Sequence, residues 1–273
     1  EYSQQQFLSD LISKFIDSGV DINEKNNEGN NAILVSVDKN DIDTVKILIE
    51  KCADINVQNK DDITPLALAV MKGNNEYFEM IKLLLSSNAN PNIKDAKGLS
   101  VVEKIIFILI YLNRENAEKE KKEESPTPDI PLEHEVDENL SKFAEDDYVR
   151  NIFELLIYKR MVDFKVLDSM GNPYFYILVI TENNYLANLL FNNGSNINQL
   201  NYEKKNILQY YLDFAQEHKI EDIYAANIIK NIIKLGIDLD HRDEQGATVL
   251  HNTLLKKPLL LTRSIVASGG SID

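Results

Sequence analysis

The chain has 273 residues, of which 44% are hydrophobic and 27% charged, so it can bury a core and lacks the composition of a disordered chain. Its formal net charge of −15 argues against a nucleic-acid or anionic-membrane binder, because both use clustered Lys and Arg. The single cysteine, Cys52, excludes an internal disulfide framework and argues against a Cys-based zinc site. We therefore expect no nucleic acid, membrane or cofactor partner, and a cytoplasmic protein.

A polar loop rich in asparagine recurs along the chain. It reads GVDINEKNNEGN from Gly19, CADINVQNKDDI from Cys52 and NANPNIKDAKGL from Asn88, and similar stretches start at Gly194 and Gly236. A loop that returns at regular intervals is typical of a repeat protein. At intervals of 33, 36, 73, 33, 42 and 33 residues, its equivalent polar positions are Asp21, Asp54, Asn90, Asp163, Asn196, Asp238 and Ser271.

A second anchor position lies eight residues beyond the first. It keeps the same intervals, so the register holds along the chain and the longer intervals are insertions into a 33-residue repeat. We number six repeats from these positions, after a partial repeat that ends at Asn23. The second anchors are Gly29, Asp62, Gly98, Gly171, Lys204 and Gly246.

Each repeat carries the pattern of two helices. A short apolar helix follows the second anchor, as in TPLALAVMKG from Thr64, and after a polar turn comes a longer amphipathic helix, as in EMIKLLLSS from Glu79. The second helix is expected to end at a residue in the left-handed conformation, such as Gly194 or Gly236. Cys52 and Asn88 hold the equivalent places in their repeats.

Three repeats carry insertions between their helices. Repeat two has three extra residues around 74–78, and repeat five has nine around AQEHKIEDI. The insertion of repeat three, placed at 114–147, is acidic: residues 115–147 hold 13 Asp or Glu and four Lys, a net charge of −9. Its prolines forbid a continuous helix, so we expect a largely disordered loop. Alternatively, it is an acidic arm that contacts a basic partner or covers the groove of the repeat array.

The repeat resembles the ankyrin repeat family, whose pattern joins D-x-x-G-x-T-P-L-H-x-A to a second helix and G-A-D-x-N. DDITPLALAVMKG and DEQGATVLHNTLL carry the first half of this pattern, and CADIN, GSNIN and GVDIN carry the second. The resemblance implies an all-α ankyrin-repeat solenoid of about six repeats plus a partial N-terminal repeat, with residues 1–273 forming a single array. It also implies a structural role for His251, at a position where the family bonds neighbouring repeats.

Stacked repeats place their loops side by side along one edge of a concave surface, which suits protein recognition. The resemblance therefore implies a non-catalytic, monomeric protein-binding module with no small-molecule substrate. Two rivals remain open: the targeting segment of a larger enzyme, and a cytoplasmic toxin-immunity protein. The many Asn, Lys and Ile hint at an A/T-rich genome, and in a pathogen such an array would be part of a bacterial effector acting in the host cytoplasm.

The loop tips and first helices are the expected partner-binding surface. By position in the repeat, its residues are Asn27, Glu28, Asp61, Asp62, Ala96, Lys97, Met170, Tyr174, Tyr176, Tyr202, Glu203, Tyr210, Glu244 and Gln245.

Four tyrosines gather in the first helices of repeats four and five, NPYFYILV and NILQYYLDF. They are either aromatic anchors for a partner or bulky residues that pack between repeats. Because Tyr174 stands at the family's Pro and Tyr210 follows the family's His, we expect these two to be the exposed ones.

No motif in the sequence predicts a catalytic, cofactor or metal site. His134 lies in the acidic insertion without a second His at helical spacing, so H-E-x-x-H is absent, and neither glycine-rich phosphate-binding motif occurs. We therefore expect that the chain is not an enzyme.

Overall fold

The computed structural model describes residues 2–109, 146–163, 165, 167, 171–180, 183–256 and 259–267. They group into two compact units, which we describe separately: the N-terminal unit holds 2–109 and 146–162, and the C-terminal unit holds the described residues from 163 onward. Of the acidic insertion predicted at 114–147, only residues 146 and 147 are described, as the start of a helix; His134 and Met170 lie outside the described residues.

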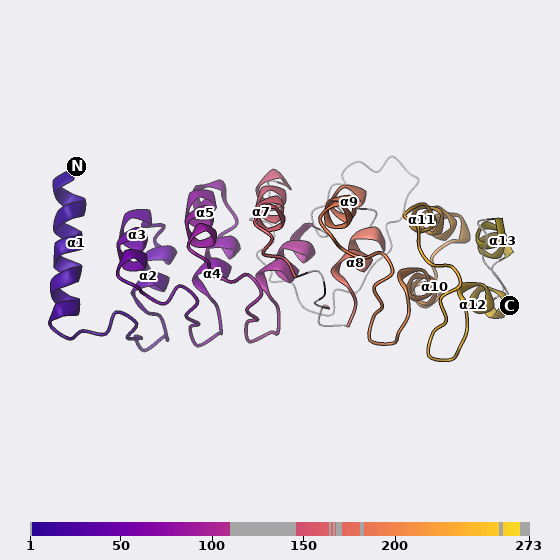
Figure 1. The fold of residues 1–273 in the computed structure, drawn as a ribbon, viewed down its shortest axis with the longest axis horizontal. Coiled ribbons are helices and arrows are strands. Elements are labelled where there is room, and N and C mark those ends of the chain that lie inside the picture. Colours follow the sequence, from indigo (N-terminus) through magenta and orange to yellow (C-terminus); the bar gives the residue numbers. More distant parts are fainter. Residues whose placement is uncertain are drawn as a thin grey trace. The chain divides into compact units, whose positions relative to one another are not determined.

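The N-terminal unit begins with a long single helix and continues as helix pairs (Figure 1). Residues 101–109 are helical and precede the last helix of this unit. The three extra residues of repeat two include the short 3-10 helix η1, as their place between the helices predicts. The elements are α1 (Tyr2–Asp17), α2 (Ala32–Asp38), α3 (Ile42–Glu50), α4 (Pro65–Met71), η1 (Asn75–Tyr77), α5 (Phe78–Ser86) and α7 (Asp146–Tyr158).

The C-terminal unit contains three further helix pairs, which are α8 (Tyr174–Ile180) with α9 (Asn184–Asn192), α10 (Ile207–Glu217) with α11 (Asp222–Lys234), and α12 (Val249–Lys256) with α13 (Leu259–Ala267). The nine extra residues of repeat five lengthen both of its helices: α10 and α11 have 11 and 13 residues, whereas α8 and α9 have seven and nine. The insertion therefore extends the helices as well as the turn between them.

Side chains just before the first helices fix where these helices begin. The oxygens of Asn31, Thr64 and Asn206 each accept a hydrogen bond from the backbone N–H three residues on, which satisfies one of the free donors of a helix start. Gln209 Oε1 accepts a hydrogen bond from the backbone N–H of Asn206, which completes a capping box. Pro65 occupies the first helical position, where no donor is needed.

The predicted helix ends are confirmed by the backbone angles. Gly194 and Gly236 have φ of 110° and 85°, and the equivalent Cys52 and Asn88 have φ of 64° and 66°. A side chain in this left-handed region costs about 1 kcal/mol, and Asn tolerates it better than Cys does. The repeat architecture therefore imposes its turn even where the residue does not favour it.

Apolar faces between neighbouring helices form the core of each unit. In the N-terminal unit α2 packs on α3 and α4, and α5 packs on α4 and α7; in the C-terminal unit α10 packs on α11 and α12. Fully buried residues such as Leu84, Phe153 and Ile229 lie in these contacts. The described residues form no strand, and none of their helices is long and apolar enough to cross a membrane. The expected all-α repeat fold is confirmed.

Candidate functional site

Each long loop that the structure describes in full is held in shape by one of its own side chains. Asn26 Oδ1 accepts hydrogen bonds from the backbone N–H groups of Glu28 and Asn30, both at 2.9 Å. This ring shapes the loop tip from within, as Asx turns do. The residues that make the same pair of bonds in the other loops are Asn59, Asp95, Asn201 and Asp243.

An asparagine ladder ties together three pairs of neighbouring loops, two in the N-terminal unit and one in the C-terminal unit. Asn23 Oδ1 accepts the N–H of Asp54 at 2.7 Å, and Asn56 Oδ1 accepts the N–H of Asn90 at 2.8 Å. In the C-terminal unit Asn198 Oδ1 accepts the N–H of Asp238 at 2.8 Å. The sequence pattern did not predict this role, although an asparagine recurs two residues after the first anchor at Asn23, Asn56, Asn92 and Asn198.

Backbone contacts add to the ladder at the loop tips. The N–H of Ala96 donates to the carbonyl of Asp61 at 3.2 Å, and the N–H of Tyr202 donates to the carbonyl of Gly171 at 3.0 Å. The tips are therefore fixed before any partner arrives, which lowers the entropy that binding would cost.

The loop-tip residues expected to face a partner are accessible. Their charges are mixed, because Lys97 is basic whereas Glu28, Asp61 and Asp62 are acidic. In the C-terminal unit Glu244 lies 3.3 Å from the ammonium of Lys204. The exposed ones are Asn27, Glu28, Asp61, Asp62, Ala96, Lys97, Tyr202, Glu203, Glu244 and Gln245.

Tyr202 is the largest of these exposed side chains, with 73% of its surface accessible. Its ring lies directly over Gly171: a Cβ added to that glycine would stand 2.1 Å from Tyr202 Cδ2. Gly171 also has φ of 82°, which disfavours any side chain there. The glycine therefore makes room for an aromatic ring that is both supported and exposed.

The expectation that Tyr174 is exposed is wrong. Tyr174 and Tyr176 are 5% and 1% exposed, and Tyr210 is half-buried, so the first two lie off the accessible surface. The ring of Tyr176 lies 5.5 Å from that of Tyr210, centroid to centroid. These tyrosines pack between repeats, which is the alternative that the sequence left open.

Tyr176 makes hydrogen bonds to the next loop from the position where the family has a histidine. It stands at the family's His position, and its hydroxyl lies 2.9 and 2.8 Å from the carbonyl oxygens of Gln199 and Lys205 in the next loop. Gln209, at the same position one repeat on, donates to the carbonyls of His241 and Ala247 at 3.4 and 2.9 Å. Burial, with a smaller effect of Tyr210, raises the pKa of Tyr176, so its proton stays available for donation.

His251 holds the same position in repeat six. Its ring nitrogen Nδ1 lies 2.7 Å from the hydroxyl of Thr248, at the start of its own helix. This contact between His251 and Thr248 lies within one repeat, so it has a structural role in holding the start of the helix.

Replacing Tyr176 by Phe is expected to lower the free energy of unfolding by about 1–2 kcal/mol, because the carbonyls of Gln199 and Lys205 lose their part-buried hydroxyl partner while the ring still fills its space. Urea unfolding followed by circular dichroism measures this. Tyr158→Phe is the matched control, since Tyr158 is 86% exposed. Equal stability of the two variants would contradict the assigned bond.

The third loop has an ionic clamp. Asp95 accepts N–H bonds from Lys97 and Leu99 and pairs with the ammonium of Lys104. Burial raises the pKa of Asp95, but the hydrogen bond from Lys104 and the N–H of Leu99 outweigh it, so the pKa lies below its ordinary value of 3.8. The carboxylate therefore stabilises the fold above pH 3.8, and this contribution is lost as the pH falls through the lowered pKa.

Lys104→Met is expected to destabilise the chain more at pH 6 than at pH 2, because the stabilisation by the clamp is fully present above pH 3.8 and is lost as the pH falls through the lowered pKa of Asp95. Urea unfolding at both pH values measures the difference. Lys46→Met is the control, since Lys46 and Asp43 form an exposed pair at 3.7 Å. A destabilisation that does not change with pH would refute the clamp.

No group of three or more His, Cys, Asp or Glu in the described part of the chain is placed to hold a metal ion. Cys52 is exposed at the end of α3. The chemistry that the described residues offer is therefore hydrogen bonding, ion pairing and aromatic contact along the loop tips.

Comparison with known proteins shows that the chain is similar to ankyrin repeat proteins. A family model described as ankyrin repeats (3 copies) matches residues 3–95. The putative ankyrin repeat protein R664 of Acanthamoeba polyphaga mimivirus is 31% identical over 134 residues, which cover 43% of this chain and 81% of the relative. The phosphocholine transferase AnkX of Legionella pneumophila is 25% identical over 261 residues, 90% of this chain, yet the chain spans only 26% of that enzyme.

Two solved structures share the fold. The ankyrin repeat domain of Bcl-3 superposes with a TM-score of 0.58 at 14% identity, covering 96% of this chain and 94% of that one. The ankyrin repeat protein EF0377 superposes with a TM-score of 0.53 at 15% identity, covering 91% of this chain and 98% of that one.

Proposed function

Because this chain belongs to the ankyrin repeat family, whose arrays are generally non-catalytic interaction modules, we propose that it binds a partner protein through its loop tips and first helices. The sequence predicts that these elements gather on a concave face. The proposal concerns this chain alone, whatever larger protein it is part of.

The observation that carries the proposal is that the loop tips are exposed and are also held by hydrogen bonds. The tips are exposed, yet the Asx rings, the asparagine ladder and the backbone bonds hold them in one conformation. A surface that is both accessible and fixed loses little entropy on binding. These hydrogen bonds recur in successive loops, which fits the recognition of a partner protein through contacts at a fixed spacing.

Within this surface Tyr202 is the proposed anchor of the C-terminal unit. Aromatic side chains dominate the energy of many interfaces when a partner buries them. Tyr202 offers its ring from a rigid base, with Glu203 and Lys205 beside it forming an ion pair at 2.7 Å. Asp61, Asp62 and Lys97 provide the polar contacts of the N-terminal unit.

A pull-down from host or source lysate tests the proposal with three proteins. The intact chain is compared with a tip variant, Tyr202→Ser with Glu203→Ser and Glu244→Ser, and with a control variant, Tyr158→Ser with Ile223→Ser. The control replaces two exposed residues of second helices. We expect the intact chain and the control to capture the same discrete protein and the tip variant to lose it. Equal capture by all three would place the site elsewhere.

A fourth protein in the same experiment lacks residues 115–144, which lie outside the described residues. Retained capture supports the loop tips as the site. Loss of capture would instead assign recognition to the acidic insertion, and stronger capture would make that insertion a cover of the site.

A second candidate function has one observation in its favour. The similarity to a phosphocholine transferase of a pathogenic bacterium extends over 90% of this chain but over only 26% of the enzyme. That match supports a role for this chain as the targeting segment of a larger effector enzyme in the host cytoplasm. Mass spectrometry of host proteins incubated with the full-length gene product tests this function. A modification that needs the full-length product and is absent with this chain alone supports the enzyme. The absence of a modification with either protein refutes it.

A further inference from the structure

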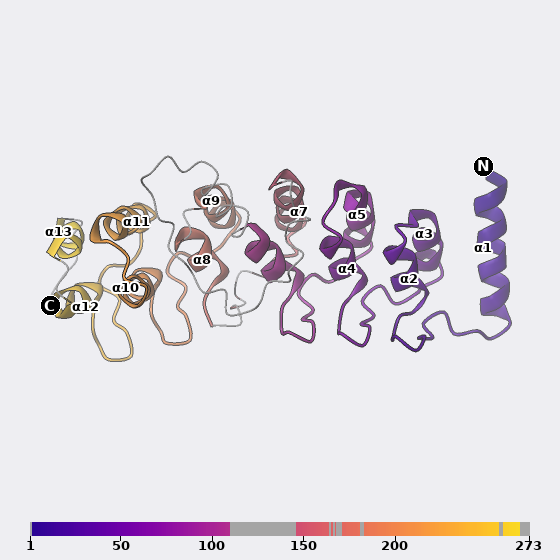
Figure 2. The same ribbon diagram turned by 180° about the vertical axis from the view of Figure 1, so that it is seen from behind.

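The C-terminal unit carries basic side chains on its second helices, outside the loop tips. Helices α9, α11 and α13 lie along one side of this unit, and α8, α10 and α12 lie along the other (Figures 1 and 2). Lys230 and Lys234 of α11 and Arg263 of α13 are exposed. We call these three residues the basic patch.

The repeat register brings the basic patch together. Arg263 stands 33 residues after Lys230, at the same position of the next repeat. Helices α11 and α13 pack against each other, and packed helices lie about 8–10 Å apart, so these two side chains leave neighbouring helices side by side. Lys234 follows one turn further along the exposed face of α11. Lys230 is exposed in a repeat that has neighbours on both sides, so the repeat itself leaves this position open.

No acidic residue of the second helices balances the basic patch. In α9, α11 and α13 the only acidic residue is Asp222, which stands about 12 Å along the helix from Lys230. Asp238 follows four residues after Lys234 but lies beyond the end of α11, where its carboxylate accepts the N–H of Asp240. The ion pairs described for this unit lie in its loops and first helices. The three cations therefore repel one another without an acidic partner among the described residues.

The same repeat position is paired in the N-terminal unit. Lys46 and Lys82 occupy it in α3 and α5, and both are exposed. Lys46 Nζ lies 3.7 Å from a carboxylate oxygen of Asp43, and Lys82 Nζ lies 2.7 Å from one of Glu79. Each acidic residue stands three positions before its lysine, whereas each member of the basic patch has an uncharged residue there. The repeat can neutralise this position within its own helix, and the C-terminal unit does not.

The size of the basic patch indicates the kind of partner. Nucleic acids and anionic membranes are bound through long rows of cations, and the formal net charge of −15 opposes both. A short acidic segment of a protein needs only a few ion pairs, and Lys and Arg form charge-assisted hydrogen bonds with its carboxylates. Because the patch is exposed, such a segment can reach the cations and relieve their mutual repulsion.

We propose that the basic patch binds an acidic segment of a partner protein, with two carboxylates that reach Lys230 and Arg263 together and a third that reaches Lys234. Charge complementarity supplies both the attraction and the preference for this class of partner. Since the patch is exposed to solvent, the interaction weakens as salt is added. The patch shares no residue with the loop tips, so this inference stands or falls independently of the proposed function.

Fluorescence anisotropy tests the proposal with the whole chain and a fluorescein-labelled peptide of about 12 residues, in which Glu alternates with Gly and Ser. A second peptide has Gln in place of Glu. At about 50 mM salt we expect the Glu peptide to bind at least about tenfold more tightly than the Gln peptide. The double variant Lys230→Glu with Arg263→Glu is expected to weaken binding of the Glu peptide about tenfold or more, whereas Tyr202→Ala leaves it unchanged.

The matched control is Lys46→Glu with Lys82→Glu, which changes the same repeat position and shifts the net charge by the same amount. All four replaced residues are exposed, so both double variants keep the fold, which circular dichroism checks. We expect the control to bind the Glu peptide within about twofold of the intact chain. Equal weakening by the two double variants would show that the peptide senses only net charge and would overturn the proposal, as would equal binding of the two peptides.

Two further arms test the choice of an acidic protein segment. Binding of the Glu peptide that appears only after deletion of residues 115–144 would assign the patch to the chain's own acidic insertion. An oligonucleotide that binds more tightly than the Glu peptide, and that loses binding in the variant with Lys230→Glu and Arg263→Glu, would assign the patch to a nucleic acid. Either result would overturn an acidic segment of a partner protein as the occupant.

Discussion

Replacing Phe175 by Ala is expected to lower the free energy of unfolding by about 3–5 kcal/mol, the largest stability effect that the structure predicts for the C-terminal unit. Phe175 is 1% exposed. Its ring lies 5.0 Å from that of Tyr176 and 5.1 Å from that of Phe191, centroid to centroid, so truncation leaves a cavity in the contact between α8 and α9. Urea unfolding measures the loss.

The matched control for this substitution is Phe7→Ala. Phe7 is also an aromatic residue of a helix, but 66% of its surface is exposed, so its truncation removes few contacts. We expect a change within about 0.5 kcal/mol. If Phe175→Ala costs no more than this control, the aromatic core between α8 and α9 is wrongly assigned.

Replacing Tyr202 by Ala is expected to weaken binding of the captured partner about 30-fold, which corresponds to about 2 kcal/mol, without changing the melting temperature. The ring is exposed and contacts the backbone of Gly171, so its removal leaves no buried cavity. Isothermal titration calorimetry with the partner measures the affinity.

Gly171→Ala provides the companion test of Tyr202. The added Cβ would stand 2.1 Å from Tyr202 Cδ2, so the ring must move, and the φ of 82° strains any side chain. We expect weaker binding and lower stability together. Unchanged affinity in both variants would remove Tyr202 from the interface and leave the proposed surface without its anchor.

The repeat period predicts most of the fold because it depends on local patterns. The left-handed turns at Cys52 and Asn88 are set within one repeat and are found as predicted. The N-cap at Thr64 is equally local, although the sequence predicted only that a helix begins there. The exposure of the loop tips follows from the same register. Recognition of the family was therefore enough to place these elements.

Features that depend on the neighbouring repeat were not predictable in the same way. Tyr174 was expected at the surface because it matches the family's Pro, but this position faces inward: Pro65, Ile207 and Val249 are buried there too. The asparagine ladder joins Asn23 to Asp54 across a repeat boundary. Such contacts appear only when two repeats are placed side by side.

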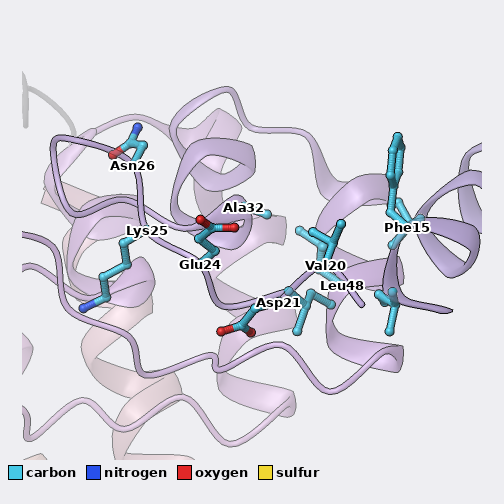
Figure 3. A pocket seen from close by; sticks show the side chains of 11 residues that line it. Phe15, Val20, Asp21, Glu24, Lys25, Asn26, Ala32 and Leu48 are labelled. Carbon is cyan, nitrogen blue, oxygen red and sulfur yellow. The ribbon is translucent and has the colours of Figure 1, made fainter. Parts of the chain in front are cut away.

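The insertions show a further limit of the sequence pattern. Nine extra residues in repeat five were assigned to the region between its helices, yet part of them lengthens α10 and α11. Polar residues such as Gln216 and Glu217 suit the exposed end of a helix as well as a turn, so composition alone does not decide between them. The sequence also did not predict the pocket that Phe15, Val20 and Leu48 line in the N-terminal unit (Figure 3).

Hydrogen–deuterium exchange of the chain, alone and with its captured partner, tests the central claim most directly. The account predicts slower exchange in the complex at the loop tips, above all at the amides of 200–206 and 242–247, with little change in α9 and α11. Protection confined to those second helices, or to residues 115–144, would contradict recognition through the loop tips and first helices.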